Sequence, residues 1–255
     1  FLREHMEPQA RIHYAVTDGG GCSPNVVQSK ASVLYMVRSP QVKKAVELQK
    51  RVDDIAAGAA LMTGTTCERK FIDGVAETIP NHVLEALLYQ NFAEVGVPQH
   101  TSQEMTFAAE LAATYDAGGH IPGSGSENAD YAARVKTLLP GTAMNDVLLP
   151  LFTGEAFCPG STDVGDVSWQ CPTAQLHVAS WPNGCPGHSW QNVSCGKTSI
   201  GHKAAITAGK VLCAAAIDLL EQPELIAAAK TEFAGRTAES YTCPIPPEAV
   251  PTIPD

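Results

Sequence analysis

Two segments of alternating apolar and polar residues, followed by a long helical period, constrain the fold of the first part of this chain most strongly. Residues 10–17 and 31–38 alternate as β-strands do, and a glycine-rich turn separates them. Residues 42–62 repeat apolar positions with a helical period, and residues 65–72 read as a third strand. A short helical stretch precedes these elements. One further strand before it would complete the βαββαβ pattern of a ferredoxin-like sandwich, so we predict that residues 1–74 form most of one small domain.

The remaining residues, 75–255, are rich in helices and loops, and the whole chain is therefore of the α/β class. Helices are predicted at residues 81–95, 102–115, 200–220 and 223–235, a buried strand at residues 171–181, and loops at residues 118–125, 141–160 and 190–198. Asn81 is the expected N-cap of the first helix. Ser102 is followed three residues later by Met105, which predicts no capping box for the second. Five prolines exclude a helix or central strand in residues 241–255, so this tail should lie extended over the surface.

Charge and size exclude several classes of partner. The 255 residues carry a formal net charge of −10, and 44% of them are hydrophobic, which is enough for a buried core in one or two domains. An acidic chain repels phosphate backbones and anionic lipids, so we expect neither nucleic-acid binding nor membrane binding. No apolar run approaches the roughly 18 residues of a membrane-spanning helix.

The cysteines favour a reducing compartment. Eight cysteines at irregular spacings are too few for a disulfide scaffold at this length. Cys213 lies within the apolar helical pattern of residues 200–220, where a buried free thiol is common. We therefore expect a cytoplasmic protein with reduced thiols.

The first residues are unusual for the start of a translated chain. Residues 1–7 begin with Phe1 and read as the last turns of a helix that has no cap before it. We expect this sequence to be a piece of a longer protein, whether by cleavage or because the other half is encoded separately.

Three clusters of residues could carry chemistry, and the first is the segment 160–169. It is rich in Gly and Ser, and its carboxylates Asp163 and Asp166 stand three residues apart. Such a pair could bind a hard cation or orient a histidine. An equally good interpretation makes Asp163 a helix or turn cap.

The second cluster surrounds His188, which lies in a Gly- and Pro-containing loop. A lone histidine is more often structural than a metal ligand. A structural zinc site of His188 with Cys185, Cys171 and Cys195 is an alternative, although these spacings lack the paired short loops of zinc fingers and ribbons.

The third cluster is Asn25 with Arg38. Arg38 closes an otherwise apolar strand, and Asn25 lies in the loop before that strand. An arginine fork and an amide are the expected donors for a carboxylate. The alternative is an arginine whose stem packs at the strand end while its charge stays in water.

Together these segments resemble the M20 family of metallopeptidases and amidohydrolases, in its aminobenzoyl-glutamate hydrolase-like branch. The resemblance runs from residues 2–5 and 11–14 through Pro24-Asn25-Val26-Val27 to residues 187–191 and 199–203, and residues 160–167 are its most specific part. It implies a zinc-peptidase-like catalytic domain interrupted by a ferredoxin-like lid that dimerises. Residues 1–74 would then be a lid lacking its first strand, and residues 75–255 the C-terminal part of the catalytic domain with a Pro-rich tail.

The resemblance also implies a site with two divalent metal ions, zinc or manganese, which polarise the scissile carbonyl and lower the pKa of a bridging water. His188 matches the family's C-terminal metal ligand, Asn25 and Arg38 match residues that bind the substrate carboxylate, and Asp163 or Asp166 would orient His188. The other ligands and the general base of the family cannot be matched here, so this part alone should be metal-free and without catalytic residues. Gln28 stands where the family usually has Pro after the Asn motif.

We therefore expect a part of a metal-dependent amidohydrolase that cleaves the amide bond of an N-acyl amino acid, such as an aminobenzoyl-glutamate-like molecule, or of a dipeptide. We expect a homodimer formed through the lid. The alternative is a non-catalytic dimerisation or partner subunit of a complete M20 enzyme.

Overall fold

The structure is a computed structural model that describes residues 1–116, 128–139, 141–152, 157–239 and 241–249. The chain divides into two compact units. Unit one comprises Phe1–Ile79, Phe157–Gln170 and Glu239–Asp255, and unit two comprises Pro80–Ala156 and Cys171–Ala238. The boundary after residue 74 stays a prediction. The loop predicted at residues 118–125 lies outside the described residues, as does the end of the predicted tail.

Unit one is built on an antiparallel pair of strands, β1 (Arg11–Asp18) and β2 (Ser32–Arg38). Both strands were predicted, with ends that differ by one residue. Tyr14 lies opposite Tyr35, and Ile12 lies opposite Val37. Since side chains alternate between the two faces of a strand, these four residues share one face of the hairpin.

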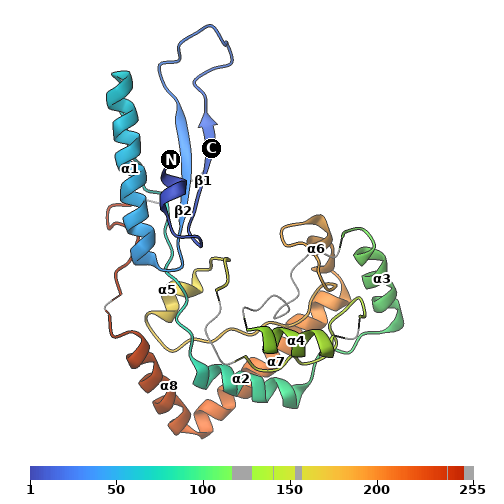
Figure 1. The fold of residues 1–255 in the computed structure, drawn as a ribbon. Coiled ribbons are helices and arrows are strands. Elements are labelled where there is room, and N and C mark those ends of the chain that lie inside the picture. Colours follow the sequence, from blue (N-terminus) through green and yellow to red (C-terminus); the bar gives the residue numbers. More distant parts are fainter. Residues whose placement is uncertain (117–127, 140, 153–156, 240, 250–255) are drawn as a thin grey trace. The chain divides into compact units, whose positions relative to one another are not determined.

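One long helix covers part of that face, as Figure 1 shows for α1 (Val42–Thr63) beside β2. Leu48 and Val52 of α1 form a small core with Ala10 and Ile12, and the 3₁₀ helix η1 (Leu2–His5) adds Leu2. Gly64 ends α1 in a left-handed conformation (φ 63°), which glycine adopts at no steric cost. The predicted helix at residues 42–62 is confirmed.

The third strand predicted at residues 65–72 is wrong. Within the described residues, β1 and β2 form a sheet of two strands only, and residues 65–80 contain no regular element. A strand needs a neighbour to pair its backbone groups, and the periodicity of one segment cannot reveal whether that neighbour exists.

Unit two is helical in the part that the structure describes. Its elements are α2 (His82–Val95), α3 (Ser102–Ala112), α4 (Ala129–Leu138), α6 (Trp190–Cys195), α7 (Ser199–Glu221) and α8 (Pro223–Arg236). Leu88 and Phe92 of α2 pack against Val211 and Ala215 of α7 in its main core. The four predicted helices are confirmed, and Asn81 caps α2 by accepting from the Leu84 amide at 3.1 Å. The sequence patterns missed α4 and the short α6, which lies in a predicted loop.

Two further expectations for unit two are wrong. Residues 171–181 form no strand, because no described segment pairs with them. Cys213 is exposed rather than buried, because the buried face of α7 is formed by other residues, Val211 and Ala215 among them. The eight cysteines form no disulfide among the described residues, and the cytoplasmic location stays a prediction.

In the residues that the structure describes, the chain is thus helix-rich with one small sheet, which is compatible with the predicted α/β class. The ferredoxin-like lid and the zinc-peptidase-like catalytic part stay predictions. Among the described residues, no helix has both the length and the apolar character needed to cross a membrane.

Candidate functional site

Arg38 stands at the end of β2 and points to another segment of unit one. Its guanidinium donates a hydrogen bond to the backbone carbonyl of Pro159, at the start of the segment that carries Asp163 and Asp166. Arg38 is half-buried, and no described carboxylate forms an ion pair with it. A guanidinium has five N–H donors, so one bond to a carbonyl leaves donors for a ligand.

The segment Phe157–Gln170 contains the short helix α5 (Val164–Ser168) and is fixed by hydrogen bonds. Asp166 accepts from the Ala76 amide at 3.2 Å and from the Tyr241 hydroxyl at 2.6 Å. The bond to Asp166 raises the pKa of Tyr241. Trp169 donates its indole N–H to the Glu77 carbonyl at 3.1 Å. Asp166 therefore holds α5 against the chain near residue 76.

Two small residues of the same segment are needed for this close packing. A Cβ on Gly165 would lie 2.0 Å from the carbonyl oxygen of Ala76, which a side chain cannot do. Ser168 is buried, donates to the Gly165 carbonyl at 2.5 Å and accepts from the Ile79 amide at 2.8 Å. Much of the most specific sequence motif is thus explained by the docking of α5.

Asp163 is the exception in this motif, because its carboxylate does not take part in the docking of α5. It occupies the N-cap position of α5, but its side chain makes no capping hydrogen bond and is exposed. Asp163 therefore stands at the predicted cap position but does not make the capping hydrogen bond. That Asp163 or Asp166 orients His188 stays a prediction, since His188 belongs to unit two.

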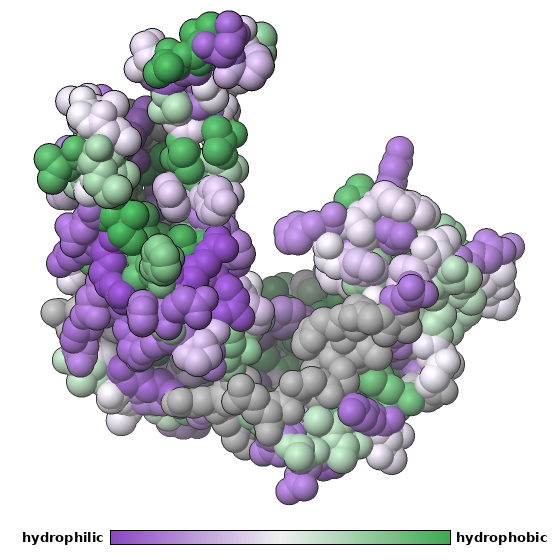
Figure 2. Space-filling view, turned by 45° about the horizontal axis from the view of Figure 1, so that its top comes forward, coloured by the Kyte–Doolittle hydropathy of each residue, from purple (hydrophilic) through white to green (hydrophobic). Residues whose placement is uncertain are grey.

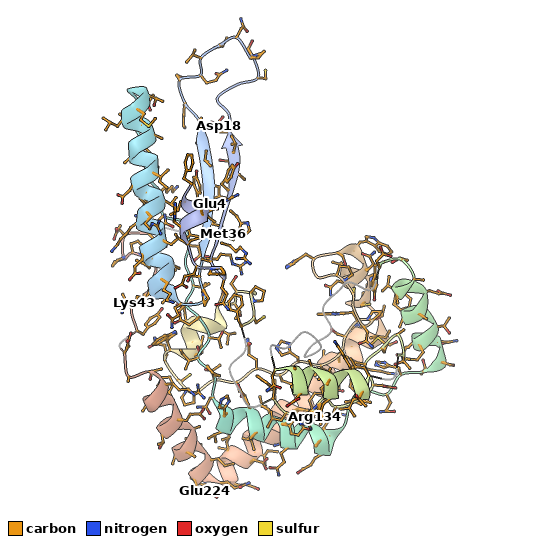
Figure 3. All side chains as sticks on the ribbon, viewed as in Figure 1. Glu4, Asp18, Met36, Lys43, Arg134 and Glu224 are labelled. Atoms are coloured by element: carbon orange, nitrogen blue, oxygen red, sulfur yellow. The ribbon has the colours of Figure 1, made fainter. Side chains whose placement is uncertain are left out.

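The structure does not bring Asn25 and Arg38 together within one chain. Asn25 lies in the exposed loop between β1 and β2, where its Oδ1 accepts from the Ser23 hydroxyl at 3.0 Å. Arg38 is at the far end of β2, about 20 Å along the strand from Ser32 at roughly 3.3 Å per residue. In Figure 3, Asp18 marks the loop end of the hairpin and Met36 lies near the other end.

His188 is exposed and has an unusual backbone. Its φ of 57° is the one positive value among the described non-glycine residues, a conformation that glycine or asparagine adopts more easily. The next residue, Ser189, caps α6 by accepting from the Asn192 amide at 3.2 Å and donates to the Pro186 carbonyl at 2.6 Å. These bonds fix the loop and present the imidazole to solvent.

The described residues do not form a metal site by themselves. No group of three or more His, Cys, Asp or Glu side chains among them could hold a metal ion. The structural zinc alternative fails on this ground, and two of its cysteines, Cys185 and Cys195, are buried. His188 can therefore supply at most one ligand to a site whose other ligands lie elsewhere.

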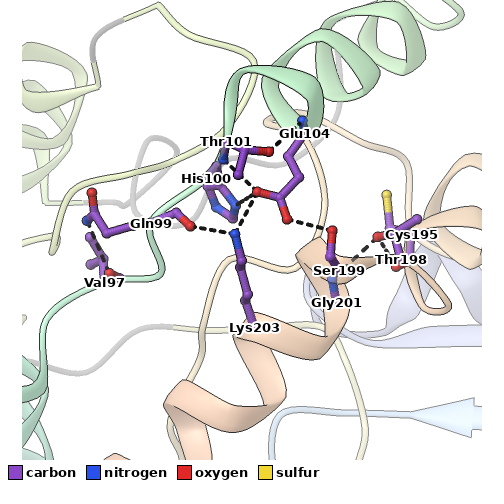
Figure 4. Close-up of polar contacts among 10 residues, drawn as sticks. All are labelled: Val97, Gln99, His100, Thr101, Glu104, Cys195, Thr198, Ser199, Gly201 and Lys203. Carbon is purple, nitrogen blue, oxygen red and sulfur yellow. Dashed lines mark hydrogen bonds and ion pairs between the residues drawn. The ribbon is translucent and has the colours of Figure 1, made fainter.

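A polar network centred on Glu104, shown in Figure 4, was missed by the sequence analysis. Glu104 is 9% exposed and accepts from Ser199 at 2.5 Å and from Lys203 at 2.7 Å. It also forms a capping box with Thr101 at the start of α3, which corrects the expectation that α3 has none. Hydrogen bonds from Lys203 and Ser199 lower the pKa of Glu104 to about 2.

His100 lies beside this network without a hydrogen bond. Its side chain is 2% exposed, and neither ring nitrogen has a hydrogen-bond partner among the described residues. Burial lowers the pKa of His100. The signal for the capping box is the Thr101-x-x-Glu104 spacing, which begins one residue before Ser102. Nothing in the sequence pointed to Lys203 and Ser199 as partners.

Comparison with known proteins gives three relatives. The chain is 38% identical to one of the subunits of p-aminobenzoyl-glutamate hydrolase of Escherichia coli over 99% of the chain and 53% of that protein. It is 24% identical to human "Xaa-Arg dipeptidase" over 91% of the chain and 42% of that protein, and 32% identical to the mouse protein of the same name over 38% of the chain. The chain spans about half the length of the E. coli and human relatives. No protein-family model matches it.

Proposed function

Because this chain belongs to the M20-like aminobenzoyl-glutamate hydrolases, we propose that it forms part of an amidohydrolase that cleaves the amide bond of an N-acyl amino acid. The identity of 38% to the E. coli hydrolase subunit, over 99% of the chain, is the observation that carries this proposal. Its substrate class is aminobenzoyl-glutamate-like, with dipeptides second because other relatives are named dipeptidases. The alternative of a non-catalytic partner subunit is not favoured by these names.

Recognition of the substrate's carboxylate is the part of this function that unit one supports. Arg38 has a fixed position, since the Pro159 carbonyl holds one N–H and α5 is fixed by Asp166. Its remaining donors can bind a carboxylate side by side, a geometry that gives both energy and specificity. The glutamate part of the substrate carries such carboxylates.

Asn25 joins this site only if two copies of the chain share it. The two outer edges of the β1–β2 hairpin have no strand partner among the described residues, and unpaired edges invite pairing. Antiparallel pairing of two hairpins about a two-fold axis places the loop end of one beside the Arg38 end of the other. Apolar side chains lie on the surface of unit one, as Figure 2 shows. Tyr14, Val16 and Val33 are among the exposed ones. A homodimer through this unit, with Asn25 and Arg38 from different copies, follows from the proposal.

We propose His188 as one ligand of the metal ions on which M20-type enzymes typically depend, zinc or manganese. An exposed imidazole on a fixed, strained backbone supports this role. The other ligands and the general base would come from outside the described residues, and no catalytic step is assigned to residues of this chain.

The test uses a fusion protein, which we call the completed protein. It joins this chain to the stretch of the E. coli relative that the match does not cover, with the segments in the order found in that relative. It should release glutamate from p-aminobenzoyl-glutamate, and it should cleave more slowly the analogue whose α-carboxylate is an amide, from which the product is isoglutamine. Failure to hydrolyse p-aminobenzoyl-glutamate, a dipeptide ending in arginine and other N-acyl amino acids would refute the proposal.

The shared site has its own test. Asn25→Ala and Arg38→Ala variants of the completed protein should each be nearly inactive. Mixed and allowed to exchange protomers, they should regain about a quarter of the wild-type activity, because half of the dimers are mixed and each mixed dimer has one intact site. No recovery on mixing would place Asn25 and Arg38 in the same copy or outside the site.

A further inference from the structure

Helix α7 carries apolar side chains on two opposite sides over most of its length. Within residues 204–220, only Lys210 and Asp218 are charged. A helix at the surface of a globular protein normally has one apolar face and one polar face. A helix that is apolar all round is normally buried on all sides.

The structure buries one side of α7 and leaves the other exposed. Ile200, Ala204, Val211 and Ala215 are at most 5% exposed and face the cores of unit two. On the opposite side, Ile206 is 62% exposed, Ile217 is 54% exposed and Leu220 is 81% exposed. Together with Gly209 and Cys213, these three residues recur every three or four positions and form one stripe, which we call the outer face of α7.

A groove extends this face toward the start of the helix. It has a volume of about 430 Å³ and runs between residues 95–99 and α7, with Ile206 and Thr207 in its lining. Lys203 and Lys210 also line it. The outer face is therefore continuous with a concave surface that has polar and cationic sides.

A second, independent feature of unit two is a segment with the pattern of a strand whose backbone finds no pairing partner among the described residues. In residues 172–180, Leu176 and Val178 pack on the α2–α7 core while Gln175 and His177 are exposed, which is the alternation of a half-buried strand. Among the described residues, the backbone groups of residues 172–180 have no backbone hydrogen-bond partner. Unpaired backbone of this kind is normally completed by a strand.

We propose that the outer face of α7 is an interface that is covered, in the assembled protein, by the part of the hydrolase fold that the E. coli relative carries outside the match. The match takes in 99% of this chain and only 53% of that relative, so about half of the relative's length is available for this contact. An occupant that brings an apolar layer and a strand suits both features of unit two. This inference rests on the proposed function in one respect, because the occupant is identified from the family membership.

Cys213 provides a direct test, because an exposed thiol on the outer face can be alkylated. In the chain alone, Cys213 should react with iodoacetamide at a rate within about threefold of that of Cys67, an exposed thiol of unit one. In the completed protein, mass spectrometry of the peptides should show Cys213 slowed at least tenfold while Cys67 is unchanged. Equal reactivity of Cys213 in both proteins would overturn the proposal. So would a chain that forms a dimer by itself with Cys213 already protected, because a second copy would then occupy the face.

A charge placed on the outer face tests the same point without a reactive thiol. Ile217→Asp should leave the urea midpoint of the chain alone unchanged, because Ile217 is largely exposed there, and should lower the midpoint of the completed protein. Ala228→Asp, on the exposed side of α8, is the matched control and should change neither. If Ile217→Asp affects both proteins equally, the proposal fails.

Protection of Cys213 without hydrolysis of p-aminobenzoyl-glutamate would refute the proposed function alone, and hydrolysis without protection would refute this inference alone.

Discussion

Replacing Glu104 by Gln tests whether the polar network joins α3 to α7 as strongly as its geometry indicates. The carboxylate accepts from Ser199, Lys203 and the backbone of Thr101. A pKa lowered from 4.5 to about 2 corresponds to roughly 3 kcal/mol of stability at neutral pH, at 1.36 kcal/mol per pH unit. Lys203 is 36% exposed, so water screens part of its attraction and we expect Glu104→Gln to cost about 2–3 kcal/mol.

Urea unfolding followed by circular dichroism measures this loss. The midpoint should fall by about 1 M at an m-value of 2–3 kcal/mol/M, whereas Glu110→Gln, an exposed residue of the same helix, should leave it unchanged. Because the pKa of Glu104 is lowered by folding, its contribution is present above pH 4.5 and is lost as the pH falls toward 2. The difference between wild type and variant should therefore shrink over that range. Equal midpoints for Glu104→Gln and Glu110→Gln at pH 7 would refute the reasoning.

Four further results are expected. His188→Asn should stabilise the chain by about 0.5–1 kcal/mol in thermal unfolding, because asparagine tolerates positive φ; a loss of stability would show that the imidazole has a structural contact. Gly165→Ala should lower the free energy of unfolding by about 1–3 kcal/mol, because the added Cβ overlaps a backbone carbonyl. Gly160→Ala should be tolerated, and a similar loss in both variants would contradict the packing of α5. Arg38→Ala should weaken transition-state binding in the completed protein, measured from kcat/KM, by about 2–4 kcal/mol for substrates with a free carboxylate. An equal loss for amidated analogues would make Arg38 structural. Since burial lowers the pKa of His100 from 6.5, stability should decline as the pH falls below 6.5, and His100→Phe should flatten that decline between pH 7 and 5; an unchanged slope would exclude His100 as its cause.

Local patterns predicted the elements that depend on local physics. The alternation in β1 and β2 and the period of α1 appear directly in the residue order, and Asn81 caps α2 as its chemistry suggests. The candidate residue Arg38 could also be placed at a strand end from sequence. What it contacts there, the Pro159 carbonyl, comes from a segment more than 100 residues away and left no local signal.

The wrong predictions share one cause. Residues 65–72 and 171–181 have strand-like composition, but a strand exists only with a partner, and none is present among the described residues. Cys213 was expected in a core because α7 carries apolar side chains on two opposite sides, and sequence alone does not tell which side of such a helix is covered. In each case the deciding factor was the neighbouring structure.

The central claim is that His188 supplies one metal ligand to an amidohydrolase. Metal analysis of the completed protein after dialysis should find about one equivalent less zinc or manganese in His188→Ala than in wild type. His177→Ala, which removes another exposed histidine of unit two, should bind as much metal as wild type. The account predicts that hydrolysis of p-aminobenzoyl-glutamate is lost together with that equivalent. Unchanged metal content and unchanged hydrolysis in His188→Ala would contradict it.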